Sequence, residues 1–164
     1  MRAGEAAVNL VVSSVGMPVA RLLRERFGTP YVVGTPVDGF AGPLADALSR
    51  AAKTGECLLP ARDTRRQGET TSYVVGEPIA ATSRAAALEI ATGKPVRAVC
   101  AVELAFDLLG PSDARTDGEE EIEHALMNAS TVYADKLYAP VCPASARLIP
   151  QPHLAFSGRH ALAG

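Results

Sequence analysis

The chain has 164 residues, of which 48% are hydrophobic and 21% are charged, and a net charge of −2. This length suits a single α/β domain spanning residues 1–164, and the weak, scattered charge gives no support to nucleic-acid binding. The sequence shows no signal peptide and no apolar run near the ~18 residues that a membrane span requires, so we expect a cytoplasmic protein with no membrane contact.

The segment Asn9–Val33 predicts a strand, a helix and a second strand in parallel with the first. Its first strand ends at Ser13 and Ser14, whose hydroxyls can cap the helix that follows. The apolar residues of this helix recur at spacings of three and four, and therefore form one stripe. The members of this stripe are Val19, Leu22, Leu23 and Phe27. Gly28 is the expected helix end.

The rest of the chain alternates predicted helices and strands. The expected helices span about 43–52, 77–92 and 117–129, the last with Asp117 as its N-cap and Glu120 in the capping-box position; the expected strands are 72–76, 95–104, 131–134 and 146–149. Residues 108–115 are expected to be a loop, and 57–69 a mobile loop or linker. This order predicts an open, mainly parallel sheet with helices on both faces, a flavodoxin-like or Rossmann-like layer.

In open α/β sheets, ligands bind beyond the carboxyl ends of the strands. The turns at these ends are predicted to be 13–16, 34–39, 76–78, 103–107 and 135–138. The backbone N–H groups of Ser13, Ser14 and Gly16 could bind an anion at a helix N-terminus, although helix capping alone also explains the serines. Gly76 opens a similar turn, but Pro78 removes one N–H group that a phosphate would use.

Three segments, in the same order along the chain, resemble the oxidoreductases of the nitrogenase component 1 type. They are 9–36 (NLVVSSVGMPVARLLRERFGTPYVVGTP), 74–78 (VVGEP) and 152–159 (PHLAFSGR). The resemblance implies the last α/β domain of a longer subunit, which would contribute part of a metal-cluster or tetrapyrrole site. It also implies other nitrogenase-like domains and an ATP-dependent iron–sulfur reductase as partners.

The resemblance makes His153 the candidate metal ligand and places Ser157 in the same segment. In the family, the cofactor-bearing subunit also supplies a cysteine ligand from the segment that resembles 9–27, where this chain has none. Through this resemblance, an iron–sulfur or related cluster is possible only in the full family assembly. The residues of this chain by themselves identify no cofactor. The three cysteines of the chain show no CxxC pair, which argues against a disulfide framework and a zinc site.

Two other functions are open at this point. The chain could be a non-catalytic dimerisation or assembly module of the same fold, and its high apolar content leads us to expect a homo-oligomer. It could also be a small Rossmann-like domain that binds an anionic metabolite at residues 13–16. No catalytic residue can be named, because Ser157 lacks the surroundings of a hydrolase nucleophile, and we expect the isolated chain to be inactive.

Overall fold

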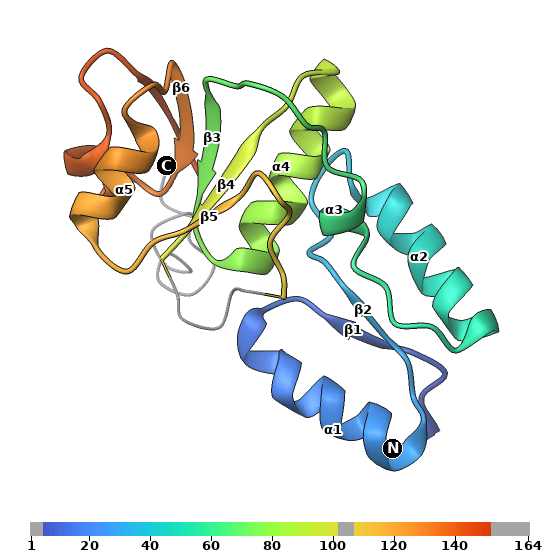
Figure 1. The fold of residues 1–164 in the computed structure, drawn as a ribbon. Helices are drawn as coiled ribbons and strands as arrows, with labels where there is room; N and C mark the ends of the chain where they lie inside the picture. Colours follow the sequence, from blue (N-terminus) through green and yellow to red (C-terminus); the bar gives the residue numbers. More distant parts are fainter. Residues whose placement is uncertain (1–4, 102–106, 152–164) are drawn as a thin grey trace, which may run out of the picture.

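A computed structural model describes residues 5–101 and 107–151, which form two parallel sheets and the helices between and around them (Figure 1). The strands are β1 (Asn9–Val11), β2 (Tyr31–Val33), β3 (Ser72–Val75), β4 (Arg97–Cys100), β5 (Ala114–Arg115), β6 (Thr131–Ala134) and β7 (Arg147–Pro150). The α-helices are α1 (Met17–Phe27), α2 (Ala41–Thr54), α3 (Pro60–Asp63), α4 (Pro78–Thr92) and α5 (Glu119–Leu126). Two 3-10 helices span Ser14–Gly16 and Lys136–Val141. None of the helices in the described ranges has the length and apolar character needed to cross a membrane.

The larger sheet has five strands in the order β5-β4-β3-β6-β7, and every neighbouring pair is parallel. Val75 on β3 packs with Ile122 and Leu126 of α5 on one face of this sheet. Val74, the next residue along the strand, packs with Ala81 of α4 on the opposite face. The predicted α/β class, an open parallel sheet with helices on both faces, is therefore confirmed.

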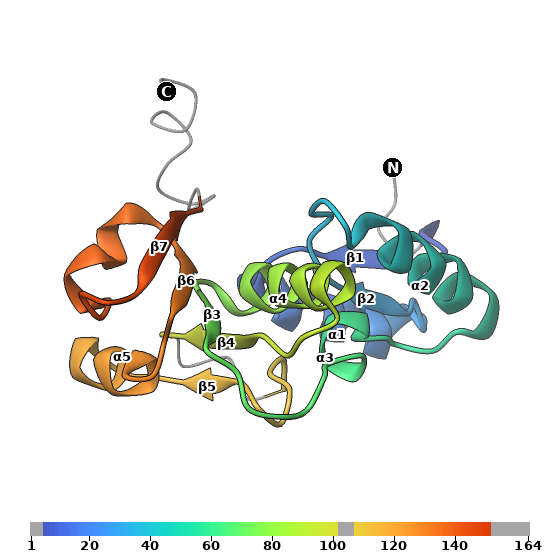
Figure 2. The ribbon, with the colours of Figure 1, turned by 90° about the horizontal axis from the view of Figure 1, so that it is seen from above.

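Helix α4 lies between the two sheets, as both Figure 1 and Figure 2 show. Its residue Ala85 packs on the five-stranded sheet, whereas Ala86 and Ala87 pack against β2 and α2. Ile79, near its first turn, joins a third cluster with Val11 of β1. A helix that is apolar on all sides is typically buried on all sides, and the many alanines let both sheets approach it closely.

The first β-α-β unit forms a sheet of its own instead of joining the larger one. Strands β1 and β2 pair in parallel, as predicted, from Asn9 opposite Tyr31 to Val11 opposite Val33. The predicted apolar stripe of α1 does not face this sheet, because the helix buries Met17 and Ala20 instead. Three of the four side chains of the stripe are largely exposed, 58% for Val19, 48% for Leu22 and 54% for Phe27, and the fourth, Leu23, is half-buried.

The segment 57–69, predicted as a mobile loop or linker, contains α3 and a buried ion cluster. The guanidinium of Arg65 lies 2.9 Å from the carboxylate of Asp113 and 3.3 Å from that of Glu89. The side chains of Arg65, Glu89 and Asp113 are only 4%, 3% and 1% exposed. The cluster thus joins this segment to α4 and to the chain just before β5.

Several helix ends follow the sequence, and others do not. Gly28, Gly55 and Gly93 end α1, α2 and α4 in the left-handed conformation that glycine tolerates best. The predicted capping box of α5 is wrong: the helix starts after Gly118, and the backbone N–H of Asp117 donates to Glu121, 2.9 Å away, not to Glu120.

Two further boundaries differ from the prediction. Helix α5 ends at Leu126, short of the predicted Ala129, because the chain already turns into β6. The predicted loop 108–115 contains the short strand β5, which extends the sheet beside β4. Two residues carry too little periodicity to predict a strand from sequence.

Candidate functional site

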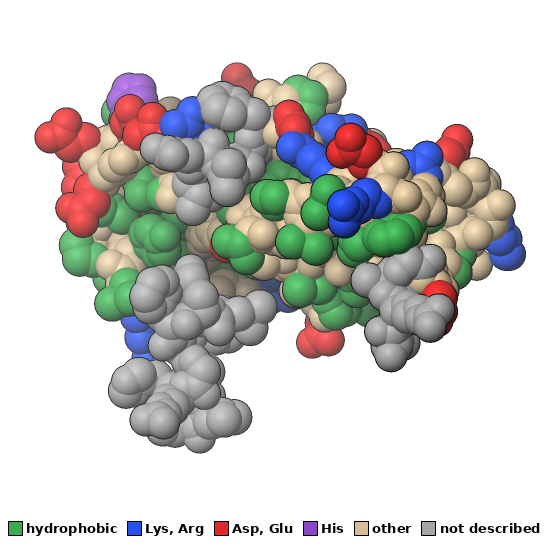
Figure 3. All heavy atoms as spheres, turned by 90° about the horizontal axis from the view of Figure 1, so that it is seen from below, with side chains coloured by type: hydrophobic (Ala, Val, Ile, Leu, Met, Phe, Trp, Pro, Cys, Tyr) green, Lys and Arg blue, Asp and Glu red, His purple; other side chains and the backbone are tan. Residues whose placement is uncertain are grey.

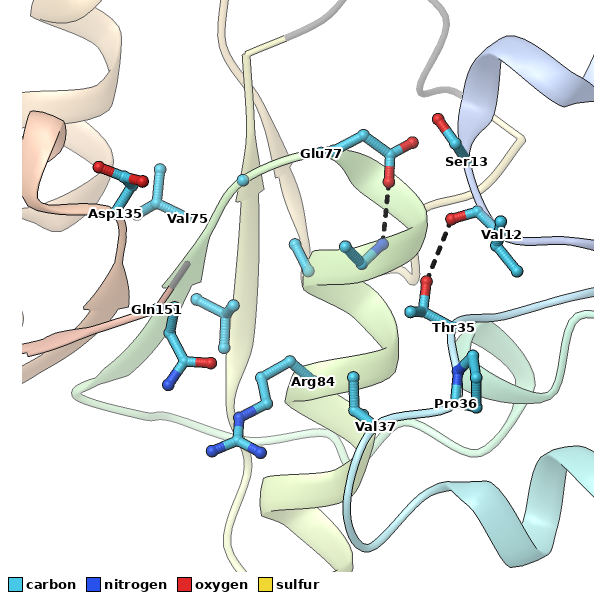
Figure 4. Close-up of a pocket in the computed structure, with 14 residues that line it drawn as sticks. Val12, Ser13, Thr35, Pro36, Val37, Val75, Glu77, Arg84, Asp135 and Gln151 are labelled. Carbon is cyan, nitrogen blue, oxygen red and sulfur yellow. Dashed lines mark hydrogen bonds between the residues drawn. The ribbon is translucent and has the colours of Figure 1, made fainter. Parts of the chain in front are cut away.

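A pocket of about 600 Å³ opens where the strands of both sheets end (Figure 4). Its lining comes from the carboxyl ends of β1, β2, β3 and β6, from the residue after β7, and from the first turns of α4. The lining residues are Val12, Ser13, Thr35, Pro36, Val37, Val74, Val75, Gly76, Glu77, Ala80, Ala81, Arg84, Asp135 and Gln151. Four of the five turns predicted from the sequence contribute to it; the fifth, 103–107, lies almost entirely outside the described residues.

The position of the pocket follows from the strand order. From β3 the chain passes through α4 to β4 on one side, whereas β6 lies on the other side of β3. This reversal leaves a crevice at the carboxyl ends of β3 and β6, the place where open α/β sheets bind their ligands. Gly76 and Glu77 follow β3 and Asp135 follows β6, so the pocket occupies that crevice.

Glu77 joins two helix N-termini at the edge of the pocket. Its Oε1 accepts a hydrogen bond from the backbone N–H of Ser14, 2.6 Å away, and its Oε2 accepts one from Ala80, 2.9 Å away. Through Ala80 it caps α4, and through Ser14 it holds the turn that leads into α1. A carboxylate is well suited to this position because helix N-termini carry partial positive charge.

The sequence-based site at residues 13–16 has a different arrangement from the one expected. Ser13 lines the pocket, whereas Ser14 is buried and its N–H group is already bound to Glu77. Neither serine side chain caps a helix, because the 3-10 turn Ser14–Gly16 separates them from α1, whose N-cap is Gly16. The chain's own carboxylate therefore occupies the place that an external anion would take.

The other predicted site residues fall into two groups. Gly76 lines the pocket beside Glu77. His153 and Ser157 lie outside the described residues, so their predicted roles stay predictions.

Two contacts that the sequence did not reveal fix Thr35, which follows β2, at the pocket: one to α4 and one to the end of β1. The backbone N–H of Thr35 donates to Ser83 Oγ at 2.9 Å, and the Thr35 hydroxyl donates to the carbonyl oxygen of Val12 at 3.1 Å. Ser83 is fully buried in the middle of α4. A serine in a helix gives no local sign of such a contact, since its partner Thr35 lies 48 residues away in the chain, just after β2.

Arg84 is the cationic residue of the pocket, and sequence analysis missed it. It lies one helical turn after Ala80, so both side chains project from the same face of α4. Its Nε atom is buried and has no hydrogen-bond partner among the described residues. Figure 4 shows its guanidinium extending from α4 toward the space beside Gln151.

The described residues do not assemble a metal site. Within residues 5–101 and 107–151, no group of three or more histidine, cysteine, aspartate or glutamate side chains is arranged to hold a metal ion. Burial raises the pKa of the Cys100 thiol, with Asp113 and Glu77 adding to the effect, and burial also raises that of Cys142. Thiols with raised pKa values resist forming the thiolate that binds iron or zinc.

Comparison of the chain with protein-family models, with curated proteins and with solved structures found no match. The fold and the site define its class: an open parallel α/β domain with a mainly apolar pocket at the strand ends, whose described lining includes one arginine and two carboxylates.

Proposed function

We propose that this chain is a ligand-binding domain of an oxidoreductase of the nitrogenase component 1 type. Its pocket would form one wall of a site for an organic cofactor or substrate, such as a tetrapyrrole. One observation carries the proposal: two of the three segments that resemble this family meet at the pocket. Val12, Ser13, Thr35 and Pro36 come from the first segment, and Val74 to Glu77 from the second.

The chemistry of the lining favours an organic ligand over a metal cluster. Val12, Val37, Val74 and Ala81 supply apolar walls, and a small number of polar groups interrupt them, which is the usual composition of a small-molecule site. The described residues supply no set of metal ligands. In this proposal, electrons come from a separate iron–sulfur reductase, and other domains complete the site.

A bulky side chain at position 80 should block the pocket. Ala80 is half-buried on the pocket face of α4, so Ala80→Trp should weaken binding of mesoporphyrin IX at least about tenfold by filling the space the ligand needs. Binding can be followed by porphyrin absorbance and fluorescence. The matched control is Ala91→Trp, an exposed position on the same helix. Equal affinity for the Ala80→Trp and wild-type proteins would contradict the proposed site.

The exposed face of α1 favours a second function, which is assembly. Helix α1 buries Met17 on one side, while Val19 and Leu22 project from another side into solvent, next to the exposed Val15 of the preceding 3-10 helix. Figure 3, which views the molecule from below Figure 1, shows hydrophobic side chains gathered on this face next to basic ones. Helices that are apolar on opposite sides are usually covered on both, so we propose that a second copy of the chain packs here.

A charge on this face should prevent self-association. In Leu22→Glu, the carboxylate would lose its hydration in the interface, so the variant should be monomeric where the wild type is dimeric. Light scattering coupled to size-exclusion chromatography measures the mass. Ile90→Glu, an exposed apolar position on α4, serves as the control. A monomeric wild type at its highest soluble concentration would exclude the interface.

A further inference from the structure

We infer that the Arg84 end of the pocket binds a carboxylate group of the ligand. The ligand class is then a largely apolar organic molecule that carries at least one carboxylate. This inference rests on the proposed function, because it concerns how the same pocket recognises its ligand.

Arg84 has no ion-pair partner among the described residues. An arginine side chain stays charged at any physiological pH, and a charge next to apolar walls is costly unless an opposite charge lies beside it. Of the six buried side-chain atoms that lack a hydrogen-bond partner among the described residues, only Arg84 Nε belongs to a residue that lines the pocket.

Arg65, whose side chain is only 4% exposed, provides a comparison. Arg65 has two carboxylates, Glu89 and Asp113, within ion-pair distance and also donates to the carbonyl oxygen of Val96. The chain therefore supplies the Arg65 guanidinium with two carboxylates, although Arg65 Nε, like Arg84 Nε, has no hydrogen-bond partner among the described residues. The half-buried Arg84 side chain, in contrast, faces a pocket without an ion pair to any described residue. A ligand anion is the partner that would make the two sites alike.

The charges of the described lining favour a carboxylate over a phosphate. Glu77 and Asp135 line the same pocket, so a doubly charged phosphate would face two acidic side chains, against a single guanidinium among the described lining residues. The nearest helix N-termini, which could assist a phosphate, are already occupied by Glu77. A singly charged carboxylate can accept two parallel hydrogen bonds from one guanidinium and needs no further cation.

The test compares mesoporphyrin IX, whose propionate groups are ionised, with its dimethyl ester, which has the same apolar body. The wild type should bind the acid at least about tenfold more tightly than the ester, because only the acid can pair with Arg84. Arg84→Met keeps the packing of the side-chain stem and should remove this preference without weakening ester binding. Arg84→Lys keeps the positive charge but loses the paired N–H donors of the guanidinium, so it should retain part of the preference for the acid. Arg50→Met, on the exposed side of α2, is the control and should leave the preference unchanged.

Each outcome separates the inference from the proposed function. If the wild type binds acid and ester equally and Ala80→Trp weakens the binding of both, the pocket is the binding site but the assignment of Arg84 to a carboxylate is wrong. A preference that survives in Arg84→Met also overturns the assignment. If inorganic phosphate competes with the porphyrin acid for the wild type but not for Arg84→Met, the Arg84 end of the pocket is a phosphate site instead. If neither porphyrin binds, the tetrapyrrole function fails and the inference fails with it.

Discussion

Replacing Arg65 with methionine should lower the free energy of unfolding by about 3 to 5 kcal/mol, the usual cost of removing one member of a buried ion cluster. The stem of methionine fills much of the same volume, so the loss comes from the charge and not from a cavity. The carboxylates of Glu89 and Asp113 would remain buried without their cation. Chemical denaturation, followed by circular dichroism, measures the change.

The expected loss is large because this cluster connects segments that are distant in sequence. The carboxylate of Glu89 accepts backbone hydrogen bonds from Arg66 and Val96, each 2.9 Å long. The carboxylate of Asp113 accepts bonds from Ala98 and Gly110, each 2.8 Å long. Without the guanidinium, these carboxylates would repel each other, and the backbone that they hold would loosen.

The matched control for this prediction is Arg62→Met in the same segment. Arg62 pairs with Asp63 at the surface, where ion pairs contribute about 0 to 1 kcal/mol, so its replacement should change little. Similar small losses for Arg62→Met and Arg65→Met would show that the buried cluster does not hold segment 57–69 in place.

Features that depend on neighbours in sequence were predictable. Glu77-Pro78 and Gly93 indicate both ends of α4, and β-branched runs indicate most of the strands, because local backbone preferences set these boundaries. The strand-end turns also pointed to the pocket, since parallel topology determines which ends meet.

Features that depend on distant partners were not predictable. The spacing in α1 shows an apolar stripe, but it cannot tell which side of a helix meets its sheet when both sides are apolar. Arg84 and Arg65 look alike in the sequence, and only the fold shows that one is paired and the other faces a pocket. Glu77 was expected only to open a helix, yet it also binds a turn 63 residues away along the chain.

Glu77→Ala should lower the free energy of unfolding by about 3 to 6 kcal/mol, since hydrogen bonds to a charged group contribute about 1.5 to 3 kcal/mol each and two are lost. Glu77→Gln should cost less, because the amide oxygen can still accept one of the two N–H groups while its NH₂ group opposes the other. Glu25→Ala, an exposed glutamate on α1, is the control and should change stability by under about 0.5 kcal/mol.

Hydrogen exchange distinguishes this role of Glu77 from a general loss of stability. The amides of Ser14 and Ala80 should lose protection together in Glu77→Ala, because one carboxylate holds both, while amides within β6 should follow only the global change. Ser14 lies in the connection between β1 and β2, and Ala80 lies in α4, which connects β3 to β4. A simultaneous loss of protection at both amides would therefore show that Glu77 couples the β1-β2 unit to α4. Ser14 and Ala80 amides that exchange as in the wild type, or a stability loss no larger than that of Glu25→Ala, would contradict this coupling.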